Sequence, residues 1–212
     1  MRVKALLTSA AVLAGVAVLR WWGVCGTGGQ RRGEVTGAPP QPRRGTLRLP
    51  DGAEVHLTAC QFDPPLVVPY KDKGAPCDRE DPLDVFATLT TASALEPERA
   101  LLLMDEPMRQ RQVAANREMG GKLLAEQPLP DRHGYIVTHW VELERDGRLY
   151  RVFRLGSRAR PMGEIAPSAG SVVLVKSATG WLQTGNLAGD PVGSWAMTMP
   201  FENLVGSHSL TP

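Results

Sequence analysis

Two stretches in the second half of the chain alternate apolar and polar side chains on either side of the pair Asp146-Gly147. These stretches, residues 135–144 and 148–155, have the two-residue period of a β-strand. An Asp-Gly pair favours a type I′ turn, whose twist matches two antiparallel strands, and Arg145 opposite Arg148 then fixes the register. One face of this hairpin carries the pairs Leu143/Tyr150, Val141/Val152 and His139/Arg154, and the other carries Glu142/Arg151 and Trp140/Phe153. The rest of the chain must therefore build a sheet around it.

Further strand patterns surround this hairpin. Residues 46–49 and 54–58 alternate around Pro50-Asp51-Gly52, which predicts an N-terminal β-hairpin. Its inward-facing residues are Leu47, Leu49, Val55 and Leu57. Residues 171–176 are nearly all valine and leucine, and Gly180 separates them from a return strand over 181–184. The Pro-rich, charged residues 63–80 are expected to connect the first hairpin to a helical region.

Three helices are expected in that region. Asp81-Pro82 is an N-cap with proline at the first helical position, and the apolar stripe behind it reaches Leu95. Pro97 begins a short second helix through Met104. A third helix begins at Pro107 and runs to about Glu126, and its apolar face consists of Met108, Val113, Met119, Leu123 and Leu124.

The order of these elements resembles a known superfamily. The helical motifs DPLDVF, EPERALLLM and EPMRQRQ precede a sheet that ends in SVVLVKSATGWLQTG. Over about residues 80–185 this resembles the NTF2-like superfamily, the cone-shaped folds of SnoaL-type and ketosteroid-isomerase-type proteins. The resemblance implies an α+β fold in which three helices pack on a curved antiparallel sheet around a pocket, catalytic in some members and used for binding or assembly in others. The isomerases' general-base carboxylate and tyrosine have no assigned counterparts here, so no catalytic residue is carried over.

The N-terminal segment has the layout of an export signal. A positively charged start precedes an apolar run over residues 5–19, which is short for a membrane span. Three fates are open: cleavage after Gly26, lipidation of Cys25, or retention as an uncleaved anchor. The predicted organisation is a signal peptide or anchor over 1–25, a disordered Gly/Pro/Arg tether over 26–45, an α+β domain over 46–185 and an extended C-terminal tail over 186–212.

Export sets the expected compartment and its redox chemistry. We expect an exported protein of the periplasm or cell envelope, either anchored to the membrane through its N-terminus or secreted. Cys60 and Cys77 could then close a loop of roughly sixteen residues, worth about 3 kcal/mol in the chain-entropy model. Two unpaired thiols are the alternative. Neither a zinc-binding spacing nor a cofactor motif occurs, so no metal or cofactor is expected.

The charge distribution excludes one class of partner. The chain has 24 basic and 22 acidic residues. Most of the basic excess lies in residues 1–46, so the remainder of the chain carries net negative charge. Nucleic-acid binding needs clustered positive charge on the folded part, and we therefore expect no nucleic-acid partner.

The strongest candidate site is the pair His139 and Arg154, which face each other on one side of the hairpin. Strict alternation along the strand places Tyr135 on the same side. A buried arginine needs a neutralising partner. This could be a small anionic ligand bound by Tyr135, His139 and Arg154, or an acidic helix residue such as Asp84 or Glu118; alternatively, this end of the sheet emerges into solvent. Five arginines between positions 148 and 160 could also form a patch for an acidic partner or anionic lipid, or only a solvated strand and loop: Arg148, Arg151, Arg154, Arg158 and Arg160.

Motifs of hydrolases, kinases and dehydrogenases are absent from the sequence, which favours binding over catalysis. The sequence therefore predicts an exported, envelope-associated binding or assembly module with an envelope protein as its partner. The alternative is a small-ligand carrier or enzyme that uses an NTF2-like pocket with His139 and Arg154.

Overall fold

The computed structural model describes residues 40–129, 134–158 and 165–210, except for the side chains of 157, 158 and 165–169. The predicted signal or anchor over 1–25, its Cys25, and residues 26–39 of the tether lie outside the described residues. Within the described part, no helix has both the length and the apolar character needed to cross a bilayer.

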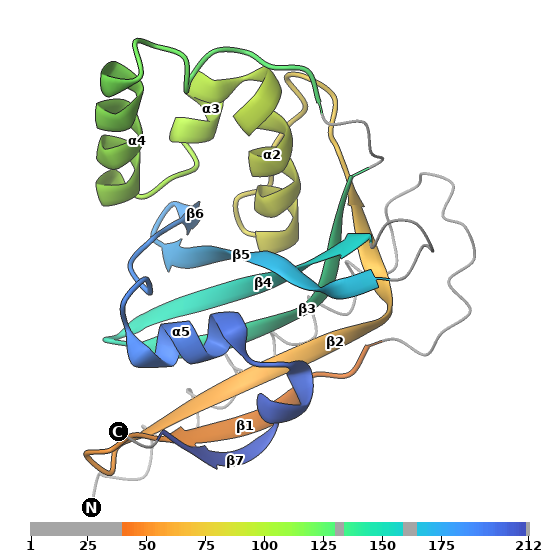
Figure 1. Ribbon diagram of the computed structural model, residues 1–212, viewed down its shortest axis with the longest axis vertical. Helices are drawn as coiled ribbons and strands as arrows, with labels where there is room; N and C mark the ends of the chain where they lie inside the picture. Colours follow the sequence, from red (N-terminus) through yellow and green to blue (C-terminus); the bar gives the residue numbers. More distant parts are fainter. Residues whose placement is uncertain (1–39, 130–133, 159–164, 211–212) are drawn as a thin grey trace, which may run out of the picture. The chain divides into compact units, whose positions relative to one another are not determined.

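The described residues form an α+β fold, as predicted, around one seven-stranded sheet (Figure 1). The strands lie side by side in the order β6-β5-β4-β3-β2-β1-β7. In chain order the elements are β1 (Arg43–Arg48), β2 (Glu54–Pro69), α2 (Pro82–Leu95), α3 (Pro97–Leu101), α4 (Glu106–Glu118), β3 (Gly134–Arg145), β4 (Arg148–Arg158), β5 (Ile165–Ser177), β6 (Gly180–Gln183), α5 (Pro191–Thr198), the 3-10 helix η1 (Phe201–Asn203) and β7 (Gly206–Ser209).

The sheet is mixed, whereas a purely antiparallel sheet was expected. All neighbours are antiparallel except β7, which returns along the outer edge parallel to β1, with Gly45 opposite Gly206. Strand β1 also begins inside the segment predicted as tether, at Arg43. Residues at the two ends of the domain therefore pair with each other. Local sequence patterns do not predict such a nonlocal contact.

The central hairpin of β3 and β4 has the register that the Asp146-Gly147 turn predicted. Both turn residues have positive φ, 53° for Asp146 and 68° for Gly147, as a type I′ turn requires. Arg145 pairs with Arg148, and all five cross-strand pairs deduced from that register are present. Local turn chemistry thus fixed the centre of the sheet.

Strand β2 is much longer than the first hairpin predicted. It pairs with β1 as expected, with Leu47 opposite Val55, but it then continues to Pro69. The prolines that suggested a connection, Pro64 and Pro65, lie where the pairing with β3 shifts register between Gln61 and Leu66. Because the ladder is interrupted there, the missing proline N–H groups remove no regular strand hydrogen bond.

The three expected helices are present, although α3 ends at Leu101 and not at Met104 as predicted. Asp81 caps α2 by accepting a hydrogen bond from the Leu83 N–H at 2.9 Å. Helix α4 ends at Glu118, earlier than predicted, because Gly120 and Gly121 follow with positive φ. Its apolar face is smaller than predicted, because Met119 is 53% exposed. Other residues of the predicted face pack on a buried cluster formed by α2, α3 and Met104, namely Met108, Val113 and Leu124.

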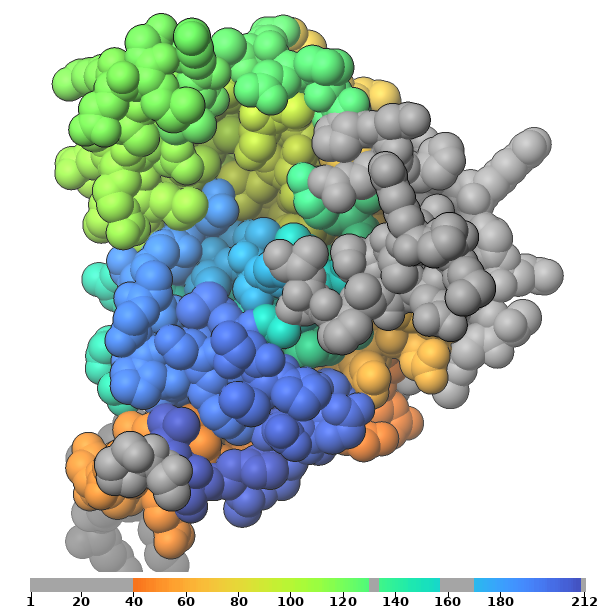
Figure 2. Space-filling model, in the orientation of Figure 1, coloured from red at the N-terminus to blue at the C-terminus, as the bar shows by residue number. Residues whose placement is uncertain are grey.

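Helices cover both faces of the sheet. On one face Phe86 of α2 packs against Phe153 of β4, with ring centroids 5.2 Å apart. On the other face α5 and η1 cover the side chains that alternate with Phe153, among them Tyr150 and Val152. Figure 1 shows α5 in front of the sheet, roughly along β3 and β4, and the space-filling view shows the C-terminal residues over the middle of this face (Figure 2).

The C-terminal residues therefore differ from the extended tail expected over 186–212. They form a helix, a 3-10 turn and a strand, and their Trp195, Phe201 and Leu204 belong to the main core. Asp190 caps α5 by accepting a hydrogen bond from the Gly193 N–H at 2.9 Å. The Asp190-Pro191 pair repeats the start signal of α2, but α5 has only eight residues, which is too short for a clear apolar period.

Candidate functional site

His139 and Arg154 lie together beneath α5 and η1, paired across β3 and β4. Their residues are 6% and 8% exposed, so the alternative in which this end of the sheet is solvated does not apply. The His139 ring lies edge-on to Phe201 of η1, with ring centroids 5.9 Å apart. The C-terminal segment thus buries a histidine and an arginine against the sheet.

Arg154 is held by neutral oxygen atoms. Its Nη1 donates to Ser171 Oγ at 3.0 Å and its Nη2 donates to the Thr198 carbonyl at 3.4 Å. Ser171 Oγ in turn donates to the Met197 carbonyl at 3.1 Å. These carbonyls form the C-terminus of α5, where the helix dipole is negative and attracts a cation. Helix α5 therefore supplies part of the neutralising charge that the sequence analysis required.

No carboxylate forms an ion pair with Arg154 among the residues that the structure describes. Of the acids expected to serve, Asp84 is paired instead with Lys71, 2.8 Å away. Burial lowers the pKa of Arg154. Burial together with the Arg154 charge, and against the exposed Glu202 of η1, lowers the pKa of His139 to about 4. His139 is therefore neutral near pH 7.

Tyr135 does not share the face of His139. A register shift between Val137 and His139 interrupts the alternation, so the strict pattern holds only on the turn side of Thr138. The Tyr135 ring packs instead against Tyr70 and Phe86, on the face covered by α2. The structure thus brings together two of the three predicted ligand-binding residues, and it adds Ser171, which lies in a predicted strand but had no predicted role.

The predicted arginine patch is not formed by the described side chains. Arg151 lies on the face opposite Arg154, with its guanidinium carbon 4.3 Å from the centroid of the Trp140 ring and an ion pair to Glu142. Arg148 is exposed at the turn. The side chain of Arg158 and all of Arg160 lie outside the described residues. Alternation and burial separate charges that were only close in sequence.

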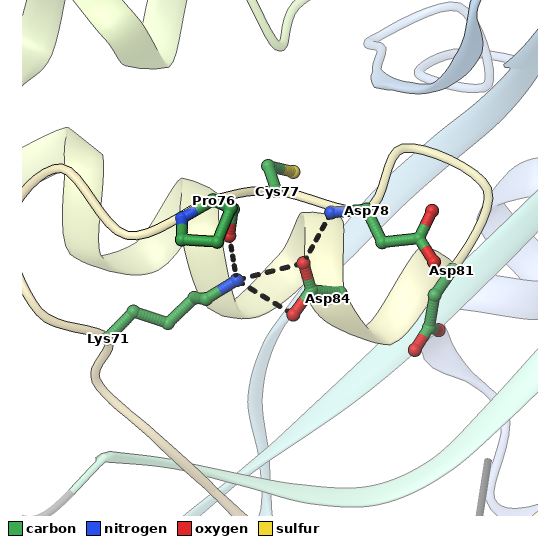
Figure 3. A pocket seen from close by; sticks show the side chains of 6 residues that line it. All are labelled: Lys71, Pro76, Cys77, Asp78, Asp81 and Asp84. Carbon is green, nitrogen blue, oxygen red and sulfur yellow. Dashed lines mark hydrogen bonds and ion pairs between the residues drawn. The ribbon is translucent and has the colours of Figure 1, made fainter. Parts of the chain in front are cut away.

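A surface cleft lies at the start of α2 and is here called the α2 cleft (Figure 3). It has a volume of about 520 Å³ and is lined by Lys71, Pro76, Cys77, Asp78, Asp81 and Asp84. Lys71 Nζ donates to both Asp84 oxygens at 2.8 Å and to the Pro76 carbonyl at 2.6 Å. Asp84 also accepts a hydrogen bond from the Asp78 N–H at 2.7 Å. These bonds tie the loop before α2 to the helix.

Two carboxylates of the α2 cleft have no cationic partner among the described residues. Asp78 and Asp81 each accept backbone N–H hydrogen bonds but form no ion pair there. Partial burial raises the pKa of Asp81, and the neighbouring Asp84 raises it further, against the Leu83 N–H. With Lys71 neutralised by Asp84, the rim of the cleft is left negative.

A second hollow of about 340 Å³ lies at the β3–β4 turn. Arg145 spans it by an ion pair from Nε to the Asp190 carboxylate at 3.3 Å, and this carboxyl group also caps α5. The hollow is lined by Arg145, Asp146, Arg148, Tyr150, Asn186, Leu187 and Asp190. Its charged residues hold the α5 start against the turn, which is a structural use of them.

The predicted disulfide between Cys60 and Cys77 is not formed. Cys60 is fully buried in β2, opposite Trp140 of β3, whereas Cys77 lines the α2 cleft and is partly exposed. The extension of β2 to Pro69 carries the chain away from Cys60, and the loop that contains Cys77 is bonded to α2 instead. Among the described residues no cluster of His, Cys, Asp and Glu could hold a metal ion.

No protein-family model, curated protein or solved structure matches the chain.

Proposed function

We propose that this chain is an exported, envelope-associated binding module, linked to the membrane or released through its N-terminal segment, that docks an envelope protein through the α2 cleft. The finer arrangement, an NTF2-like cone with a curved sheet behind a signal or anchor segment and a flexible tether, belongs to the same proposal. The observation that carries the binding role is the open α2 cleft with two carboxylates that lack a cationic partner among the described residues.

The chemistry of the α2 cleft indicates a partner segment with basic side chains. The Lys71–Asp84 ion pair fixes the walls before any partner arrives, which reduces the entropy lost on binding. The remaining carboxylates, Asp78 and Asp81, attract a cation and speed encounter by electrostatic steering. An open hollow of this kind accommodates side chains of a protein surface.

The contacts of Ser171 and His139 favour binding over catalysis. A serine nucleophile needs a base that accepts its proton, but the Ser171 hydroxyl donates to the Met197 carbonyl. The His139 ring is bonded to Thr138, 3.1 Å from its Nδ1. Both side chains therefore take part in attaching the C-terminal segment.

Photo-crosslinking from Cys77 tests the docking surface. The full chain with Cys25→Ser is labelled at Cys77 with a photoactivatable maleimide, and the matched control, in the same background, carries the label on β7 through Cys77→Ser with Ser207→Cys. We expect one crosslinked envelope protein from Cys77 and none from the control. An excess of a short polylysine peptide should abolish the crosslink, and polyglutamate should not.

The double variant Asp78→Asn with Asp81→Asn keeps the backbone hydrogen bonds of both residues and removes their charge. It should weaken crosslinking at least tenfold. A crosslink of equal yield in this variant, an equal yield from the β7 control, or no crosslink at all would contradict the proposal. A reporter enzyme fused after residue 39 tests export separately, and activity confined to the cytosol would refute that part.

A further inference from the structure

The hollow at the β3–β4 turn, called here the turn hollow, carries polar groups that its structural role does not use. Arg145 and Asp190 form the ion pair that holds the start of α5. Arg148 forms no ion pair with a carboxylate of the described residues. Within the same part of the chain, Asn186 is bonded through its backbone N–H alone, to Thr184 Oγ1 at 3.0 Å. Two hydrogen-bonding side chains at the rim are therefore available to a ligand.

A third polar group, the Tyr150 hydroxyl, reaches the turn hollow from the core. Tyr150 is only 4% exposed and belongs to the main core together with Leu187. Its hydroxyl has no hydrogen-bond partner among the described residues, and it is not one of the fully buried polar atoms that lack a partner. The small exposed surface of Tyr150 must therefore include the hydroxyl oxygen, where the residue lines the hollow. A hydroxyl held in this position can bond to a molecule that enters the hollow.

These three side chains can all donate hydrogen bonds, which defines the chemistry of a ligand. The Asp190 carboxylate already accepts from the Gly193 N–H at 2.9 Å and from Arg145 Nε at 3.3 Å. The side chain of Asp146, the other acid of the hollow, is 82% exposed, so water and salt screen its charge. The available groups are therefore donors, and the Arg148 guanidinium adds a positive charge to them. An anionic oxygen acceptor satisfies both requirements.

We propose that the turn hollow is a binding site for a small soluble organic acid. The ligand carboxylate accepts hydrogen bonds from Arg148, Asn186 and the Tyr150 hydroxyl, and the apolar part of the ligand lies against Leu187 at the floor. The hollow has a volume of about 340 Å³, within the range of about 300 to 1,000 Å³ that small-ligand sites occupy. It shares no lining residue with the α2 cleft, so this inference stands or falls independently of the proposed docking function.

NMR titration of the full chain at constant ionic strength tests the class of ligand. Butyrate supplies a carboxylate on a short apolar chain, butyramide has the same shape without the charge, and inorganic phosphate has the charge without the apolar chain. The Gly147 amide and Leu187 methyl signals should shift saturably with butyrate. We expect butyramide and phosphate to bind at least about tenfold more weakly. Equal affinity for butyramide or phosphate, or no saturable shift with butyrate, would overturn the proposal.

Two substitutions test the assigned donors. Arg148→Gln removes the charge of an exposed side chain and should weaken butyrate binding about tenfold, while Tyr150→Phe keeps the ring in the core, removes only the hydroxyl and should weaken binding about fivefold. Arg44→Gln is the matched control, because it removes an exposed arginine from β1 outside the hollow and should leave the Kd unchanged. Wild-type affinity in either donor variant, or an equal loss in Arg44→Gln, would contradict the site.

Discussion

Acidification is expected to destabilise this protein through His139. In the folded chain, burial of the His139 ring and the neighbouring Arg154 charge together lower the pKa of His139 from 6.5 to about 4. Unfolding releases the ring to water, where it binds a proton at higher pH. The folded state therefore has its full His139 contribution above pH 6.5 and loses it as the pH falls towards 4, because only the unfolded chain gains a proton in that interval.

The size of this effect follows from the two pKa values. The interval between 6.5 and about 4 corresponds to about 3 kcal/mol of unfolding free energy, most of which is lost by about pH 4.5. Groups facing the ring from the packed elements are Arg154 on β4, which lowers the pKa, and Glu202 at η1, which raises it. Glu202→Gln should therefore deepen the acid loss.

Urea denaturation at several pH values between about 7.5 and 4.5 measures the effect. His139→Gln is the matched variant, because it keeps a polar side chain under α5 and cannot titrate. The carboxylates, including Asp81 with its raised pKa, titrate equally in both proteins, so their effect cancels in the difference between the two unfolding free energies. The wild type should lose about 2 to 3 kcal/mol more than the variant. Parallel pH curves for the two proteins would refute the assignment of a buried, neutral His139.

Three further predictions concern the packing of the C-terminal segment and the cysteines. Arg154→Ala should lower the free energy of unfolding by about 3 kcal/mol in denaturant melts, because it opens a cavity and leaves the Thr198 carbonyl of α5 without its donor. Arg154→Met keeps the apolar stem of the side chain and should lower the free energy of unfolding much less. Asp190→Ala should cost about 1 to 2 kcal/mol in the same assay by removing the α5 cap, and Asp190→Asn should restore most of it. In the folded protein a thiol reagent should modify Cys77 within minutes and Cys60 only after unfolding. Equal modification rates of the two thiols in a mass-spectrometric time course would contradict the buried position of Cys60.

Local chemistry determined which parts of the fold were predictable. The Asp146-Gly147 turn specifies its own backbone conformation, so the pairing of β3 with β4 followed without knowledge of the remaining chain. Asp81-Pro82 likewise gave the start of α2, since a cap and a first-turn proline act within four residues. The pairing of His139 with Arg154 was therefore available from the sequence.

The parts that were missed depend on contacts between distant segments. Nothing near Thr138 signals the register shift that moves Tyr135 to the other face, because such a shift is set by neighbouring strands. Prolines in β2 indicated a connection, yet the sheet accommodates them at an irregularity. The parallel edge strand β7 and the short α5 acquire their structure only by packing on the sheet. Ser171 and Thr198 could not be assigned as partners of Arg154 before α5 was placed.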